Sequence, residues 1–167
     1  MEKILDFRVG FGQDSHRFSD DPERRLVLGG LEIKGERGLE GNSDGDAVIH
    51  AICRAIEQAI GGDSFFIYAD EMHEKGIDDS REYLKTALDH ARKKGYEINN
   101  LGISLECQKP KIIPIAEKMK EVLGRILELD SDRISINATS GEDLTSFGRG
   151  EGIQVFAIVS LVKYEED

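Results

Sequence analysis

The sequence predicts a single α/β or α+β domain, residues 1–167, built as a layer sandwich in which strands and helices are interleaved. Three observations predict this fold class. The length of 167 residues is typical of one domain, and a hydrophobic share of 39% is enough for one packed core. Residues 153–163 form a nearly continuous apolar run, which is typical of a central strand buried on both faces.

The expected order of elements is β, β, α, α, β, α, β, β. Gly61 and Gly62 end the first helix, and Pro114 opens the third. Residues 63–79 are expected to be irregular and acidic. The expected strands are residues 6–12, 26–34, 98–108, 133–139 and 153–163, and the expected helices are residues 47–60, 80–94 and 114–127.

The start of the first helix has a recognisable capping pattern. Ser43 can accept hydrogen bonds from the backbone N–H groups that follow it, and Asp46 stands three residues later, as in a capping box. Beyond them, Val48, Ile52 and Ile56 recur at helical spacing. The helix is therefore expected to be capped by Ser43 and to turn an apolar stripe toward the core.

The net charge of −11 argues against non-specific nucleic-acid binding, which needs lysine and arginine against phosphates. An anionic small molecule would need local positive charge, metal ions or helix N-termini to offset that charge. No stretch reaches the ~20 apolar residues of a membrane span. The first residues lack the pattern of a signal peptide, and the two cysteines cannot form a multi-bridge framework, so a cytoplasmic protein is expected.

Asp14 and His16 form a candidate metal-ligating pair, because residues two apart in an extended segment point to the same side. With His50 they would make a set that suits Zn²⁺ and leaves a fourth position for a substrate oxygen. Asp46, one helical turn before His50, is expected to orient it. The alternative is a chance tripeptide and an ordinary surface histidine. The remaining histidines, His73 and His90, are expected to face solvent.

Three further segments can bind phosphate. Residues 138–143 offer two hydroxyls and Glu142, which can hold a divalent ion. Arg149 stands between glycines in residues 148–152, and arginine is a strong phosphate ligand. Lys109 and Lys111 flank Pro110 after an expected strand. Each segment also has a plain interpretation as a polar turn, with a structural ion pair in the case of Arg149.

Together these pieces resemble the 2-C-methyl-D-erythritol 2,4-cyclodiphosphate synthase family over residues 8–163. The resemblance rests on five motifs in family order: Gly-x-Asp-x-His, Ser-Asp-Gly-Asp-x-x-x-His, Pro-Lys, Ala-Thr-Ser and Gly-Arg-Gly-Glu-Gly. It implies a ferredoxin-like fold, with a mixed sheet on one side and helices on the other. It also implies a homotrimer whose sheets face the centre and whose three active sites lie between subunits.

The resemblance implies a lyase of non-mevalonate isoprenoid biosynthesis. The 2-phosphate of 4-diphosphocytidyl-2-C-methyl-D-erythritol 2-phosphate attacks the β-phosphorus, and CMP leaves as the cyclic diphosphate forms. Zn²⁺ would be held by Asp14, His16 and His50, and a Mg²⁺ or Mn²⁺ ion by Glu142. Such an intramolecular phosphoryl transfer needs positioning and charge neutralisation and no protein nucleophile.

The resemblance also implies the substrate contacts. Asn42 and Ser140 match catalytic positions, and Ser43 contacts substrate. The cytidine pocket matches residues 107–111 and the Thr139-Ser140 region, and the ribose and erythritol contacts match residues 63–70. Arg149 matches a residue lining a central channel that can hold an isoprenoid diphosphate. The implied substrate-binding residues are Ser43, Asp63, Asp70, Cys107, Lys109, Lys111, Thr139 and Arg149.

This sequence departs from the family pattern in its substrate loops. Asn42 replaces a histidine, and asparagine can donate a hydrogen bond but cannot become cationic. Phe65 replaces a glycine and would narrow or redirect the pocket. Three readings follow: a divergent but active synthase, a non-catalytic or substrate-drifted trimer that binds a nucleotide or isoprenoid diphosphate, and another metal-dependent phosphohydrolase on the same fold. The other substitutions are Tyr68-Ala69, Met72, Asn137, Ser140 and Leu144-Thr145-Ser146.

Overall fold

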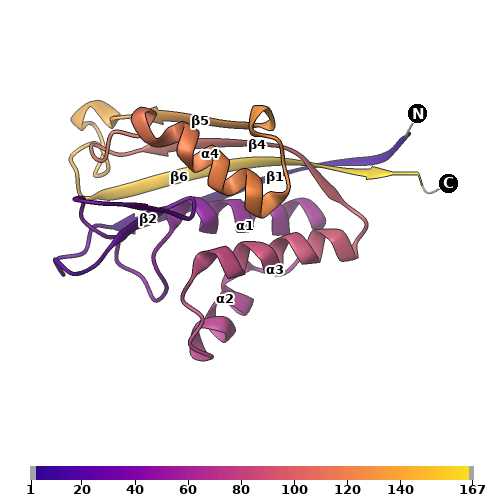
Figure 1. The fold of residues 1–167 in the computed structure, drawn as a ribbon, viewed down its shortest axis with the longest axis horizontal. Coiled ribbons are helices and arrows are strands. Elements are labelled where there is room, and N and C mark those ends of the chain that lie inside the picture. The colour runs from indigo at the N-terminus through magenta and orange to yellow at the C-terminus, as the bar shows by residue number, and fades with distance from the viewer. Residues whose placement is uncertain (1–2, 166–167) are drawn as a thin grey trace.

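The computed structural model describes residues 3–165, which form a mixed four-stranded sheet with helices on one face (Figure 1). The strand order is β1 (Ile4–Arg17), β6 (Gly152–Tyr164), β4 (Glu97–Glu106), β5 (Ile134–Thr139). The β4–β5 pair is parallel, and the other two pairs are antiparallel. A separate hairpin joins β2 (Leu26–Leu28) to β3 (Leu31–Ile33). The predicted mixed sheet with helices on one side is therefore confirmed.

The central strand β6 is fully buried on the face toward the helices and only partly buried on the other face. Its side chains that face the helices are fully buried, whereas Ile158 on the other face is 53% exposed. On the neighbouring strand β1, Phe7, Val9 and Phe11 are 54%, 58% and 44% exposed. The prediction of a central strand is right, but burial on both faces is wrong for the single chain. We call these exposed residues of β1 and β6 the open sheet face.

Helices α1 and α4 lie against the sheet, α3 packs beside them, and α2 lies farthest from the strands (Figure 1). Glycine in β1 lets helix α1 lie directly on the strand: a Cβ atom at Gly10 or Gly12 would come within 1.9 Å of a carbonyl oxygen of α1. This close approach places the first turns of α1 beside the end of β1. The helices are α1 (Ala47–Ile60), α2 (Phe65–Glu74), α3 (Ser80–Lys93) and α4 (Ile113–Leu127).

The structure corrects three sequence expectations. The first strand continues beyond residue 12 to Arg17. Residues 63–79 are not wholly irregular, because they contain α2, which buries Phe65 and Ala69. Asp46, and not Ser43, caps α1: its carboxylate accepts from the N–H of Ile49 at 3.0 Å. Ser43 stands too far before the helix and accepts instead from Gly45.

In the part of the chain that the structure describes, every helix is too short or too polar to cross a membrane.

Candidate functional site

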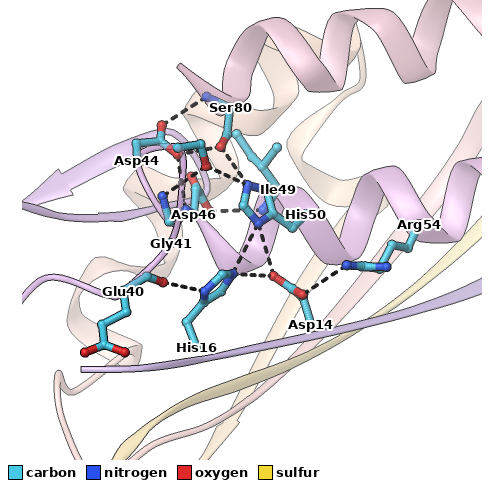
Figure 2. Close-up of polar contacts among 12 residues, drawn as sticks. Asp14, His16, Glu40, Gly41, Asp44, Asp46, Ile49, His50, Arg54 and Ser80 are labelled. Carbon is cyan, nitrogen blue, oxygen red and sulfur yellow. Dashed lines mark hydrogen bonds and ion pairs between the residues drawn. The ribbon is translucent and has the colours of Figure 1, made fainter. Parts of the chain in front are cut away.

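The three predicted metal ligands converge where β1 meets α1 (Figure 2). Asp14 and His16 project from the strand and His50 from the second turn of the helix. Oδ2 of Asp14 lies 2.8 Å from Nε2 of His16 and 3.1 Å from Nδ1 of His50, and the two imidazole nitrogens are 3.4 Å apart. One oxygen and two nitrogens thus face a common point, and this donor set suits a divalent transition metal such as Zn²⁺.

The hydrogen bonds behind each imidazole leave the correct nitrogen available to a metal. Nδ1 of His16 donates to the carbonyl oxygen of Glu40 at 2.6 Å, so Nε2 keeps its lone pair. Nε2 of His50 lies 2.9 Å from Oγ of Ser80. The Ser80 hydroxyl donates its own proton to Asp44, so its oxygen accepts from Nε2–H of His50. Nδ1 of His50 therefore faces the common point without a proton.

The electrostatics favour an ionised carboxylate among these ligands. Burial acts to raise the pKa of Asp14, but the His16 and His50 imidazoles beside it outweigh burial and lower that pKa well below its usual range. Burial acts to lower the pKa of His16, but Asp14 outweighs it and raises that pKa. Because Asp14 carries a full negative charge beside two imidazoles, the cluster attracts a cation.

A pocket of about 160 Å³ opens beside these ligands. Three of the predicted substrate-contact residues line this pocket, namely Asn42, Ser43 and Asp70. Phe65 also lines the pocket, and its buried ring lies 5.0 Å from the His50 ring. Asp63 lines a neighbouring hollow of about 500 Å³ that also touches Phe65.

The remaining predicted residues form a second group at the ends of β4 and β5 and before β6. Cys107 donates its backbone N–H to the carbonyl oxygen of Thr139 at 3.1 Å. The Ser140 hydroxyl lies 3.2 Å from Oε1 of Glu142, and Arg149 contacts the Glu151 carboxylate at 3.4 Å. None of the described residues of this group lines the metal pocket. The single chain does not bring these residues and the metal ligands together; they include Cys107, Lys109, Lys111, Thr139, Ser140, Glu142 and Arg149.

One predicted role belongs to other residues. The Asp46 carboxylate accepts from the backbone N–H groups of Gly29 and Gly30, at 2.8 and 2.6 Å, besides capping α1, and it does not orient the His50 side chain. Ser80 and Asp44 do so instead. The sequence marks Ser80 only as a helix start, and its contact with His50 depends on how α3 packs against α1.

The two histidines expected to face solvent are only half exposed. Nδ1 of His73 contacts the Asp78 carboxylate, and His73 lines the metal pocket. Nδ1 of His90 lies 2.7 Å from Oε1 of Glu57, a buried carboxylate. Neither histidine belongs to the cluster of metal ligands among the described residues.

Comparison with known proteins decides the family. The YgbB family model matches residues 7–162. This chain belongs to the YgbB family. The resemblance inferred from the five motifs is therefore confirmed.

Relatives in this family include known enzymes. The chain is 44% identical over 161 residues to 2-C-methyl-D-erythritol 2,4-cyclodiphosphate synthase of Chlamydia muridarum, a match that covers 95% of this chain and 89% of the relative. Among solved structures, the bifunctional IspDF from Campylobacter jejuni matches with a TM-score of 0.88 and 34% identity, over 98% of this chain and 44% of that protein. The CDP complex of IspF from Plasmodium falciparum matches with a TM-score of 0.84 and 28% identity, over 98% and 100%.

Proposed function

We propose that this chain is a 2-C-methyl-D-erythritol 2,4-cyclodiphosphate synthase of non-mevalonate isoprenoid biosynthesis. It converts 4-diphosphocytidyl-2-C-methyl-D-erythritol 2-phosphate to the cyclic diphosphate and CMP. The observation that carries the proposal is the convergence of Asp14, His16 and His50 beside a pocket. The identity of 44% to a synthase supports the same assignment.

The proposed reaction needs no covalent bond between the protein and the substrate. An oxygen of the 2-phosphate forms a bond to the β-phosphorus, and the bond from that phosphorus to the bridging oxygen breaks as CMP leaves. Both groups belong to one molecule, so the residues of this chain hold the two phosphates in line and offset their charge. Zn²⁺, when bound by the three ligands, supplies a Lewis acid for the attacked phosphate.

We assign the second ion, Mg²⁺ or Mn²⁺, to Glu142. Its carboxylate offers the hard oxygen ligands that these ions prefer, and it stands next to the hydroxyl of Ser140. In the metal pocket, Asn42 would donate amide N–H groups to a phosphate oxygen, and Ser43 would contribute its backbone or hydroxyl. Asp70 and Asp63 would accept from the hydroxyls of the methylerythritol.

The second group of predicted residues would bind the cytidine nucleotide. Lys109 and Lys111 bring positive charge to its phosphates, while Cys107 and Thr139 frame the base. The Plasmodium falciparum relative was solved as a CDP complex, which supports a cytidine site in this family. Arg149 would face a central channel between subunits that can accept an isoprenoid diphosphate.

A homotrimer with composite active sites accounts for two features of the single chain. The open sheet face carries Phe7, Val9, Phe11 and Ile158, and their exposure calls for a partner. The second group of predicted residues, which would bind cytidine, does not line the metal pocket of its own chain. In the proposed trimer the open sheet faces meet at the centre. Each metal pocket is completed by the cytidine-binding residues of a neighbouring subunit.

Turnover of the cytidine diphosphate substrate, followed as CMP release together with metal analysis, tests this function. We expect CMP and the cyclic diphosphate in equal amounts from zinc-loaded protein. Zinc binding with no CMP release would contradict the proposal. The non-catalytic alternative is not favoured, because the curated relatives are synthases. The cytoplasmic location stays a prediction.

A further inference from the structure

Arg54 occupies a place in the site that the sequence motifs do not mark. It follows His50 by one turn of α1, so its side chain lies on the same face of the helix. It lines both the metal pocket and the neighbouring hollow that contains Asp63. Among the described residues that line the metal pocket, Arg54 is the sole lysine or arginine.

The Arg54 guanidinium has donors to spare. Its nearest acceptor is Oδ1 of Asp14, 3.5 Å from Nη2, at the outer limit of a hydrogen bond (Figure 2). Its Nε is buried and has no hydrogen-bond partner among the described residues. A guanidinium carries five N–H donors, so one long contact leaves most of them unused. A ligand oxygen cannot reach the buried Nε, so the donors available to a ligand are those of the two Nη atoms.

The surroundings hold the guanidinium in place and keep it reachable. The Phe65 ring lies 5.2 Å from Cζ of Arg54, within the range of a cation–π contact. The Arg54 side chain is nevertheless 35% exposed. Phe65 restrains the Arg54 guanidinium, and Arg54 lines both the metal pocket and the neighbouring hollow. Arg54 can therefore present paired N–H groups to a ligand that lies across both.

We propose that Arg54 is a further substrate-binding residue, whose guanidinium donates to a phosphate oxygen of the diphosphate beside the metal. The inference rests on the proposed function, because it takes the diphosphate as the ligand. It explains how a protein of net charge −11 receives a polyanion at this pocket. It also supplies a permanent cation where the nearby Asn42 cannot become one.

The binding of CDP and CMP to zinc-loaded protein, measured by titration calorimetry, tests the inference. We expect the wild-type protein to bind CDP more tightly than CMP. In Arg54→Gln the CDP affinity should fall by roughly 10- to 100-fold, the factor that corresponds to a hydrogen bond with a charged group. CMP affinity and zinc content should not change, and Arg54→Lys should recover part of the loss. Arg92→Gln makes the same change in net charge at a distant ion pair and serves as the control.

Each outcome decides between the two proposals. Equal CDP affinity in Arg54→Gln and wild type overturns the role of Arg54, while CMP release by the wild type would leave the synthase proposal standing. Loss of zinc in Arg54→Gln would show that Arg54 acts through Asp14, and it also overturns the inference. A CDP preference that depends on Arg54 supports the contact between Arg54 and phosphate. If the same wild-type protein releases no CMP, the synthase proposal is contradicted while the role of Arg54 stands. No preference for CDP over CMP in the wild type overturns the inference.

Discussion

Oγ of Ser80 lies 2.9 Å from Nε2 of His50, although the two residues stand 30 positions apart in the sequence. The contact joins the first turn of α3 to α1 and fixes which imidazole nitrogen faces the metal site (Figure 2). Asp44 accepts both the hydroxyl proton and the backbone N–H of Ser80. A carboxylate–hydroxyl–imidazole chain therefore supports one candidate metal ligand on the side away from the metal site.

Removal of this support should weaken metal binding while the protein stays folded. Ser80→Ala leaves the Nε2 proton of His50 without its acceptor, and the imidazole can then turn or change tautomer. We expect zinc affinity to fall roughly 10- to 100-fold, the usual effect of losing a group that orients a ligand. Competition with a chromogenic chelator measures this affinity. Ser131→Ala, at an exposed position, is the control, and wild-type affinity in Ser80→Ala would contradict the role.

His50→Ala removes one of the three ligands outright. We expect loss of bound zinc and a fall in CMP release of at least about 100-fold, because the ion supplies several kcal/mol of charge stabilisation. The variant should keep its circular dichroism spectrum and its oligomeric state. His90→Gln keeps a donor toward Glu57 and should retain zinc. Full zinc occupancy in His50→Ala would remove His50 from the site.

The packing of α1 on β1 predicts a severe effect at Gly12. A Cβ atom there would lie 1.9 Å from the carbonyl oxygen of Ala51, which is backbone and cannot swing aside. Gly12→Ala should lower the free energy of unfolding by about 1–3 kcal/mol or more, as measured by urea denaturation. Gly102→Ala is the matched control, because the nearest atom to its added Cβ is a side-chain oxygen at 3.6 Å. Equal stability of the two variants would contradict the close approach.

The open sheet face predicts the position of the subunit interface. Val9→Lys puts a charge in the middle of this face, where a buried lysine would lose its hydration in the trimer. We expect sedimentation of the variant as a folded monomer and CMP release near background. Ile113→Lys changes a residue of similar exposure on α4 and should leave the assembly intact. A trimeric Val9→Lys variant would place the interface elsewhere.

Local spacing predicts only part of the candidate metal site. Asp14 and His16 share one side of a strand, and His50 follows a recognisable helix start, but spacing alone leaves a chance pattern open. The set of three is implied by the family motifs, and the structure brings the three side chains together. The same spacing rule applied to α1 would have marked Arg54, four residues after His50. The link from Ser80 to His50 depends on how α3 packs against α1, which no local pattern reveals.

The errors have similar physical causes. Helix α2 does carry an apolar stripe at helical spacing, formed by Phe65, Tyr68, Ala69 and Met72. The exposed Phe66 and Ile67 interrupt that pattern in the sequence, and so the expectation of an irregular segment is wrong. The apolar run of β6 predicts burial on both faces, but on the second face the single chain buries Ser160 and Val162 and leaves Ile158 exposed. The run is equally consistent with a face that another subunit covers.

The three candidate metal ligands come from both layers of the sandwich: Asp14 and His16 from the sheet, and His50 from the helix laid upon it. An ion bound by all three would link the sheet to the helix layer. The unfolded chain lacks this arrangement of ligands and would bind the ion more weakly. A ligand that binds only the folded state raises the free energy of unfolding in proportion to the logarithm of its free concentration, once that concentration is well above the dissociation constant. In the proposed synthase, the concentration of this ion would therefore affect both the stability of the fold and the rate of the reaction.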